Sequence, residues 1–427
     1  MKSAAAHLAP LARRAFRLLW IGQTVSSAGD ALVQVAFVFA VLHVGGDAID
    51  IGTIAAIGTV TRVALILIGG VWADRLKRQF VMLTSDAARA AMQATLAVLL
   101  ITGHARIWEL GLGTAVFGAA DAFFGPASAG LIPETVPPEE LQRANSLMTI
   151  PASLLQIGGP AVAGVLVAAF QPGLVFAVDA VSFAISAVSL GLLRLPARSM
   201  PARGSFRADL AAGWHQLAIR PWYWINLCAH ACYNFAVPAG LVLGPVIAAR
   251  QLGGASAWGA ISASFGAGAV VGGVIGLRLK PRRPLVVANL AGVTGGLPAL
   301  ALAGPLPTWA ICVASALAAA GLLVLNSVWT ATMQQLIPDE VRSRVDSYDW
   351  LISLVAMPAG FALAGPLARV IGDAATLTGA AVLVSVPVGL IVLVPGIRAV
   401  RRTADGRVTG PQPRHRPGSV QPTEATG

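Results

Sequence analysis

Apolar stretches of about 20 residues recur along this 427-residue chain from one end to the other, and they constrain its fold more than any other feature. A single segment in lipid has to satisfy its own backbone hydrogen bonds, and none of these stretches shows the short alternation of a barrel strand. Each is therefore predicted to be a membrane-spanning helix. Twelve stretches qualify by length: approximately residues 16–43, 51–72, 80–103, 107–133, 147–170, 174–195, 222–249, 257–277, 284–304, 308–335, 348–371 and 374–396.

Composition supports a lipid environment. Hydrophobic residues make up 56% of the chain and charged residues 11%, whereas about a quarter of the residues of a soluble protein are charged. The net charge of +11 would suggest nucleic acid in a soluble protein. Here the basic residues lie at the ends of apolar stretches, where they set membrane orientation, so no nucleic-acid partner is predicted. The three cysteines lie inside apolar stretches and indicate neither a disulfide framework nor a metal site.

The basic residues also predict the orientation of the chain. Of the 30 Lys and Arg residues, 25 fall on the side of the N-terminus, which places both termini in the cytoplasm. The longest internal loop, residues 194–221, separates an N-terminal bundle (1–193) from a C-terminal bundle (222–400). Within this loop, residues 208–219 predict either a short amphipathic surface helix or a linker. The tail, 401–427, is rich in Pro, Gly, Thr and Arg and is predicted to be disordered.

A short pattern occurs twice and indicates that one unit is used in both halves. Residues 69–78 read GGVWADRLKR, and residues 272–280 read GGVIGLRLK, an offset of 203 at which Leu277 replaces Asp74. Pro138-Glu139-Glu140 and Pro338-Asp339-Glu340 form a second pair at an offset of 200. Self-similarity at a fixed offset is typical of repeated architecture.

The first copy carries more than orientation requires. A loop selected only for topology needs basic residues, whereas this one also has a carboxylate and two glycines. The alternative is a latch in which Asp74 pairs with an Arg or caps a helix of the opposite half and separates when the halves rock. The predicted latch residues are Gly70, Asp74, Arg75, Lys77 and Arg78, extended by a local pair between Asp86 and Arg89 near the cytoplasmic end of the third helix.

With these motifs in view, the chain resembles transporters of the major facilitator superfamily, in particular the bacterial exporters of drugs, macrolides and siderophores. The resemblance covers residues 12–400. It implies two six-helix bundles around a central cavity, working by alternating access. The residues that carry it are 70–78 in the signature loop between helices two and three, together with 22–30, 121–127, 144–146 and 179–183.

Two departures from the family pattern bear on coupling. The antiporter signature of helix five has Leu155 and Ala163 in place of two glycines, which leaves Gly159, Pro160 and Gly164 as the predicted hinge. Proton-coupled relatives often carry an Arg inside helix four, where this chain has Asp121. Proton antiport is nevertheless the mode of coupling that the resemblance favours.

Three charged residues are predicted to lie near the bilayer midplane. Asp30, Arg62 and Asp121 fall 11–14 residues from the helix ends. A lone charge there costs at least about 2.5 kcal/mol, so each is expected to face the interior and be paired. Either Asp30 or Asp121 carries a proton as its pairing with Arg62 changes, or the group is a static pair that fixes helix register. Asp179, nearer the outer end of helix six, has the same two interpretations.

Uncharged polar and aromatic residues are weaker candidates. Four amides are predicted either to bind substrate or to hydrogen-bond between helices. Two aromatic residues are predicted either to line the cavity or to pack in the core. These candidates are Gln34, Gln156, Asn234 and Asn326, and Phe123 and Trp329. His230 is expected to be satisfied within its bundle, with a proton relay as the alternative. Gly268, Gly272 and Gly276 predict a smooth packing face on helix eight.

These features together predict an all-α, twelve-helix carrier of the plasma membrane that works as a monomer. The resemblance implies export driven by protons, and the few fixed charges predicted near the midplane favour a small amphipathic molecule as the substrate. An importer, a lipid flippase and a sensor that does not transport remain as alternatives. No phosphate loop, metal spacing or activated nucleophile is apparent, so neither an enzyme nor a cofactor is expected.

Overall fold

The computed structural model describes residues 9–194, 219–304, 306–337, 355–403 and 405–411, with Val345 and Ile352, and describes 67–75 by their backbone alone. The first half contains α2 (Ala9–Ala12), α3 (Arg14–His43), α4 (Ala48–Arg75), α5 (Arg78–Ile101), α6 (Ile107–Thr135), η1 (Pro138–Glu140), α7 (Leu141–Ala169) and α8 (Pro172–Gly191). The second half contains α10 (Pro221–Ile247), η2 (Ala248–Leu252), α11 (Ala255–Arg278), α12 (Pro284–Gly292), η3 (Val293–Gly296), α13 (Leu297–Ala303), α14 (Thr308–Leu336), α16 (Met357–Ile371), α17 (Asp373–Leu390), η4 (Ile391–Leu393), α18 (Pro395–Ala399), β1 (Arg401–Arg402) and β2 (Val408–Thr409).

The helices confirm the predicted all-α membrane fold. Within the described residues, ten helical segments are long and apolar enough to span a bilayer, and Met357–Ile371 is a shorter apolar helix. The remaining segment, α5, has a spanning length of 24 residues. It carries Asp86, Arg89 and Gln93 on its buried side and is therefore less apolar than the others.

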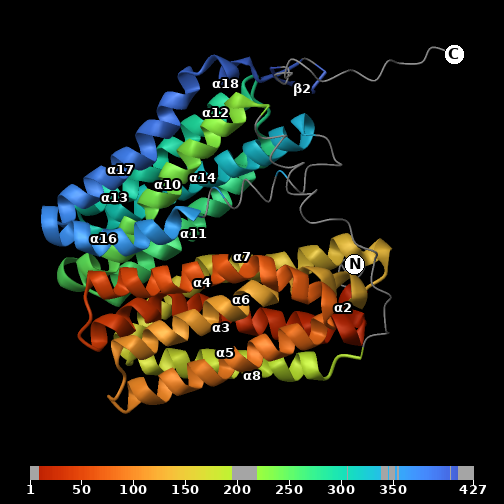
Figure 1. Cartoon of the computed structure of the whole chain (residues 1–427), viewed down its shortest axis with the longest axis vertical. Helices are drawn as coiled ribbons and strands as arrows, with labels where there is room; N and C mark the ends of the chain where they lie inside the picture. The colour runs from red at the N-terminus through yellow and green to blue at the C-terminus, as the bar shows by residue number, and fades with distance from the viewer. Residues whose placement is uncertain are drawn as a thin grey trace.

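The twelve segments form two bundles, one from each half of the chain (Figure 1). In the N-terminal bundle α3 packs on α7 and α8, α5 on α6 and α8, and α4 on α6. In the C-terminal bundle α11 packs on α14, and α10 on α16 and α17. The bundles meet at one end and diverge toward the end where α2 and α18 lie, which we call the terminal side; the opposite end is the far side (Figure 1).

Glycine and proline set several of the helix boundaries. Gly45 ends α3 with a φ of 84°, and Gly372 ends α16 with a φ of 88°, a left-handed conformation that only glycine adopts readily. Pro172, Pro221 and Pro284 stand at the starts of α8, α10 and α12, where a missing N–H is not needed by the helix.

The glycines of α11 form the packing face that their spacing predicted. A Cβ at Gly268 or Gly272 would collide with the backbone of Ala316 or Ala320 in α14, and one at Gly276 would meet Ser327 at 2.8 Å. Small residues in this arrangement let two helix backbones approach closely, so van der Waals contact holds them together where lipid gives no hydrophobic drive.

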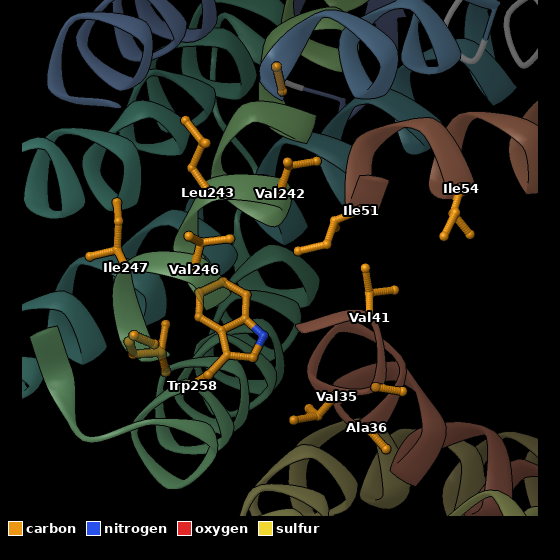
Figure 2. Close-up of a cluster of buried hydrophobic side chains, with 14 of the residues drawn as sticks. Val35, Ala36, Val41, Ile51, Ile54, Val242, Leu243, Val246, Ile247 and Trp258 are labelled. Atoms are coloured by element: carbon orange, nitrogen blue, oxygen red, sulfur yellow. The ribbon is translucent and has the colours of Figure 1, made fainter. Parts of the chain in front are cut away.

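The largest apolar cluster joins the two bundles at the far side. Val41 and Ile51 of the N-terminal bundle point toward Val242, Val246 and Trp258 of the C-terminal bundle (Figure 2). All five side chains are at most 8% exposed. The far side is therefore closed by packed side chains, whereas the ribbons separate toward the terminal side.

The start of the tail corrects the prediction that disorder begins at residue 401. β1 and β2 form an antiparallel hairpin in which Arg401 pairs with Thr409. Val408 is 7% exposed in an apolar cluster at the end of α14, and its backbone N–H donates to Gln335 at 3.0 Å. An apolar side chain and a turn glycine, Gly406, thus give an otherwise polar segment a place to fold. The amphipathic helix predicted at 208–219 falls almost entirely outside the described residues.

Candidate functional site

A cluster of charged side chains lies in the N-terminal bundle. Arg62 was predicted to pair with Asp30 or Asp121 and to face the interior; it pairs with Asp121, but its side chain is 54% exposed. Arg62 Nε, from α4, lies 2.9 Å from Asp121 Oδ2, on α6. The other oxygen, Asp121 Oδ1, accepts a hydrogen bond from Arg89 Nη2 of α5 at 3.2 Å. One carboxylate therefore bridges two guanidinium groups from two further helices.

Arg89 and Asp86 lie deeper than predicted. Arg89 is 11 residues from the start of α5, about 16 Å along the helix, and its side chain is 4% exposed. Asp86, fully buried, lies 3.7 Å from Arg89, so the predicted local pair is present. The same Arg89 reaches Asp121, however, so the pair belongs to the interior cluster and the expectation that it extends a surface latch is corrected.

Three aromatic rings surround the Arg89 guanidinium. Its central carbon lies 4.8 Å from the ring centres of Phe117 and Phe124, both on α6, and 5.3 Å from that of Phe183, on α8. Phe117 and Phe183 also contact each other edge to face at 5.8 Å. Aromatic faces attract a cation without hydrogen-bonding it, which makes a buried arginine tolerable while leaving its N–H groups for carboxylates.

Asp179 is fully buried and held by neutral donors. Its Oδ2 accepts a hydrogen bond from Gln93 Nε2 at 2.6 Å, and its Oδ1 accepts one from Ser182 Oγ at 3.1 Å. Gly29 of α3 makes room for it, since a Cβ at that position would collide with the Asp179 carboxylate. Two hydrogen bonds from neutral side chains fix the position of this carboxylate between α3, α5 and α8.

Asp86 and Asp30 are the carboxylates of the cluster that lack hydrogen bonds within the described part of the chain. Both buried oxygens of Asp86 have no partner, and neither has the buried Oδ1 of Asp30. The charges that act on Asp30 are those of Asp179, Arg89, Asp121 and Asp86. Four predicted interior charges, Asp30, Arg62, Asp121 and Asp179, are thus brought into one bundle, with Arg89 among them.

A hollow of about 770 Å³ opens on the terminal-side half of α7. Its lining combines an apolar edge with four polar side chains at helical spacing: Pro138, Leu141, Gln142, Asn145, Ser146, Thr149 and Ile150. Ser146 and Thr149 donate their hydroxyl hydrogens to the carbonyls of Gln142 and Asn145 in their own helix. Their oxygens, and the exposed amides of Gln142 and Asn145, form a polar stripe that can hydrogen-bond a ligand.

This stripe lies on the face of α7 that contacts the other bundle. Gln142 and Pro160 are 18 residues apart, and so are Ser146 and Gly164. Because 18 residues make about five full turns, the two members of each pair lie on the same face of α7. At the far side, Pro160 O and Gly164 Cα approach Gly259 of α11, where a Cβ would be 2.6 and 2.9 Å from them. The stripe therefore faces the space between the bundles, where they diverge (Figure 1).

The predicted hinge residues face two partners. Gly159 packs against Ala31 of α3 within its own bundle, whereas Gly164 meets Gly259 across the junction. Pro160 is buried between them. Helix α7 is thus in close backbone contact with both halves of the molecule.

The other predicted cavity residues do not line the hollow. Gln34, Gln156 and Asn326 are exposed on their helices, and Phe123 is half-buried in an apolar cluster at the terminal side. Trp329 is 7% exposed and stacks on Tyr223 at 5.3 Å, so it packs in the core of the C-terminal bundle.

Polar groups in the C-terminal bundle satisfy one another. His230 Nε2 lies 3.1 Å from Asn226 Nδ2, and Asn226 Oδ1 accepts a hydrogen bond from Asn289 Nδ2 at 2.9 Å. Asn234 donates to the His230 carbonyl at 3.0 Å. These contacts connect α10 to α12 and give His230 a structural partner.

The signature loop is bound to its own bundle at the terminal side. Arg78 donates to Gly130 O at 2.8 Å and pairs with Glu134 at 2.9 Å, both on α6. Gln79 donates to the carbonyls of Leu190 and Leu193 at the end of α8. Lys77 lies 5.9 Å from the ring centre of Phe80. For Gly70, Asp74 and Arg75 the structure describes the backbone alone.

An ion pair joins the bundles at the far side. Arg369 of α16 lies 2.6 Å from Asp47 Oδ2. Asp47 Oδ1 accepts the backbone N–H groups of Ile49 and Asp50 and so caps α4. One turn before Arg369, a Cβ at Gly365 would lie 2.6 Å from Ile49 Cα. We call this contact the far-side link.

Comparison with known proteins identifies the family. A family model described as transmembrane secretion effector matches residues 5–413. The chain belongs to this family of the major facilitator superfamily. It is a multi-pass membrane transporter of small molecules and not an enzyme.

Relatives with similar sequences are named as efflux proteins. The chain is 24% identical over 365 residues to macrolide efflux protein A of Streptococcus pyogenes, covering 84% of this chain and 90% of that protein. It is 28% identical over 393 residues to the multidrug efflux pump Tap of Mycolicibacterium fortuitum, covering 88% and 93%.

Solved structures show the same fold. The nucleoside transporter NupG superposes with a TM-score of 0.72 at 12% identity, covering 88% of this chain and 98% of that one. A bacterial homologue of the lysosomal transporter Spinster, in an inward-facing unoccupied conformation, has a TM-score of 0.64 at 16% identity, covering 89% and 93%.

Two polar stripes of this transporter's candidate site were not predicted as such. Asp86 and Arg89 were predicted only as a local pair; together with Gln93 they are spaced three and four residues apart, which places them on one face of α5. Gln142, Asn145, Ser146 and Thr149 show a similar spacing on α7, which begins at Leu141, before the predicted apolar stretch. Helical periodicity of polar residues in and just before the apolar stretches would have found both.

Proposed function

We propose that this transporter exports small amphipathic molecules across the plasma membrane in exchange for protons, working as a monomer with both termini in the cytoplasm. The observation that carries the proposal is the hollow on α7, whose polar stripe and apolar edge suit a substrate with both kinds of surface. The basic-residue bias supports the orientation, and in that orientation the hollow opens to the cytoplasm. The names of the efflux relatives agree with export.

The contacts at the far side and the divergence of the bundles at the terminal side support alternating access. In the present arrangement α4 contacts α16 and α7 contacts α11 at the far side, and the bundles diverge at the terminal side. Release of substrate on the far side requires these contacts to separate while the terminal side closes. We propose that Gly70, Asp74, Arg75, Lys77 and Arg78 then form the latch, with Arg78 exchanging Glu134 for a partner on the other bundle.

The buried carboxylates supply the coupling. Within the described residues, Asp30, Asp86, Asp121 and Asp179 have two guanidiniums near them, those of Arg62 and Arg89. Four carboxylates against two cations leave a surplus of negative charge that bound protons would neutralise, since an unpaired buried charge is costly. Movement of such a proton between the two sides of the membrane is what would drive export.

The experiment measures uptake of erythromycin and of ethidium into inverted membrane vesicles, with and without a protonophore. Uptake that collapses with the protonophore supports proton-driven export. Uptake that persists with the protonophore contradicts the proposed proton coupling. Accumulation in right-side-out vesicles and not in inverted ones contradicts the proposed direction of transport. Asn145→Leu is expected to lower the initial rate about fivefold for the loss of one hydrogen bond to substrate. Leu154→Ala, on an exposed position of the same helix, is the matched control.

A further inference from the structure

Four buried polar atoms in the charged cluster have no hydrogen-bond partner within the described residues: both oxygens of Asp86, Asp30 Oδ1 and Arg89 Nε. Asp86 already lies beside Arg89 on the same helix, at 3.7 Å, whereas Asp30 Oδ1 and Arg89 Nε belong to different helices. One is an acceptor and the other a donor, and their side chains act on each other electrostatically. Unsatisfied buried groups are uncommon in folded proteins, and a complementary pair of them in one cluster calls for an explanation.

The surroundings of Arg89 permit its guanidinium to change partners. Phe117, Phe124 and Phe183 hold it by their faces and edges, and such contacts do not fix which N–H group points where. Its link to Asp121 is one hydrogen bond of 3.2 Å, and its distance to Asp86 is 3.7 Å, too long for a strong one. Arg62 also pairs with Asp121, at 2.9 Å, so Asp121 keeps a cationic partner if Arg89 leaves.

We propose that Arg89 is a positioning residue that moves from Asp121 to Asp30 when Asp30 loses its proton, and returns when Asp30 is protonated. The inference rests on the proton coupling proposed above and assigns the proton to Asp30. When a proton from water bonds to the Asp30 carboxylate, the neutral group no longer holds the guanidinium, which bonds to Asp121. When that O–H bond breaks and the proton leaves to water, the ionised carboxylate accepts Arg89 Nε–H.

The other charged groups of the cluster are accounted for. From α8, Asp179 is fixed by Gln93 and Ser182. From α4, Arg62 neutralises Asp121, and from α5, Asp86 stays beside Arg89. Helix α7, which also packs on α3, has no charged residue between 144 and 169. Asp30 is thus the carboxylate of the cluster for which the described residues show neither an ion pair nor a hydrogen bond to its buried oxygen.

Exchange of Arg89 would change how three helices are connected. Asp30 lies on α3, Arg89 on α5 and Asp121 on α6. With Arg89 on Asp121, α5 is joined to α6; with Arg89 on Asp30, α5 is joined to α3. Because α3 also packs on α7, the helix that contacts the other bundle, protonation of Asp30 is connected to the junction between the halves through packed helices.

The test observes Arg89 directly in the purified full-length protein in lipid nanodiscs. Nitrogen NMR of arginine Nε groups is recorded across a pH series, with the Arg89 signal identified by its loss in Arg89→Lys and the Arg62 signal by its loss in Arg62→Lys. In the wild type the Arg89 signal is expected to shift with pH as Nε gains an acceptor. In Asp30→Asn, an isosteric variant that mimics the protonated carboxyl, that shift is expected to be lost. The Arg62 signal is the internal control and is expected to keep its hydrogen-bonded position throughout.

The outcomes separate the two proposals. An Arg89 signal that does not shift with pH, or that shifts equally in Asp30→Asn, overturns the exchange even if transport is proton-driven. If the signal follows Asp30 but transport in proteoliposomes ignores the proton gradient, the exchange stands and the proton coupling falls. Should Arg89→Lys not fold, Asp121→Asn gives the second assignment, since replacing its charged acceptor by a neutral amide is expected to change the Arg89 signal in the state where Asp30 is protonated.

Discussion

At the scale of single residues, Gly29 decides whether the charged cluster can assemble. It lies next to Asp30 on α3, and a Cβ there would collide with the Asp179 carboxylate and the Ser182 hydroxyl, both buried. Gly29→Ala is therefore expected to be destabilising by about 1–3 kcal/mol, because the crowded polar groups have no room to retreat. The measurement is the midpoint of thermal unfolding of the purified protein in detergent, which is expected to fall.

Gly125→Ala is the matched control for that substitution. Gly125 lies in α6 of the same bundle, and a Cβ there would meet nothing within 4 Å. Alanine favours a helix over glycine by up to about 1 kcal/mol, so this control is expected to keep or raise the midpoint. Equal behaviour of the two variants would show that Asp179 is not closely packed against α3.

Single residues also show how far the pairing and depth of the charged side chains could be predicted from the sequence. The depth of Arg62 along its helix was enough to predict that it pairs with a carboxylate at the same depth, but not whether that carboxylate is Asp30 or Asp121. The contact of Arg89 with Asp121 was not predicted, because it depends on the rotation of α5 against α6, which the length of an apolar stretch does not specify. Asp86 was placed too near the surface, since counting from the edge of an apolar stretch ignored the polar first turns of α5, which begins at Arg78.

At the scale of elements, α7 and α11 form one of the contacts that close the far side. The carbonyl of Pro160 and the Cα of Gly164 lie where a Cβ on Gly259 would have to go. Because both obstacles are backbone atoms, Gly259→Ala is expected to push the two helices apart. We predict a longer distance between spin labels placed at Gln171 and Gln251, near the far-side ends of α7 and α10, measured by pulsed electron resonance in a cysteine-free background.

Gly273→Ala, on α11 itself, provides the comparison for this experiment. A Cβ at Gly273 meets nothing within 4 Å, so the label distance is expected to match that of the parent protein. If Gly259→Ala also left the distance unchanged, the α7–α11 contact would not be a determinant of which side is closed.

The elements themselves were largely predictable. Residues that limit helices in lipid, namely prolines, glycines and charges, are read directly from the sequence, and the structure places α3, α6 and α14 within two residues of the predicted limits. The hairpin of β1 and β2 was missed because its stability comes from Val408 packing at the end of α14, a contact between segments about 70 residues apart. Local composition, which is polar there, contains no sign of it.

At the scale of the whole molecule, the repeat and the apolar stretches predicted two bundles but not their relative arrangement. The contacts that close one side are few: the apolar cluster, the glycine contacts and the far-side link. Two arrangements of the same bundles differ by only a few kcal/mol, a balance that no single motif reveals. The pairing of Asp47 with Arg369 could not be predicted for the same reason, since it joins one bundle to the other.

The far-side link is expected to bias this balance without responding to pH near neutrality. Burial alone would raise the pKa of Asp47, but the N–H groups of Asp50 and Ile49 and the guanidinium of Arg369 together hold that pKa below its ordinary value. Because the pKa of Asp47 is lowered, the link stabilises the closed far side fully at any pH above the ordinary carboxyl pKa. That stabilisation is lost only as the pH falls through the lowered pKa. The link therefore stays charged across about pH 5–8, the range in which a pH-driven transporter works.

Asp47→Asn and Arg369→Gln are expected to shift the population away from the closed far side while leaving the pH profile of transport unchanged. The side chains are 42% and 66% exposed, so the pair contributes at most about 1 kcal/mol, or about a fivefold change in population. Asn still caps α4, so the helix start is preserved. The label distance defined above reports the shift, and Arg250→Gln, an exposed basic residue on the same side, is the control. A pH profile that moved in either variant would place part of the proton coupling in this link, because a group that stays ionised over the whole range has no means of changing that profile.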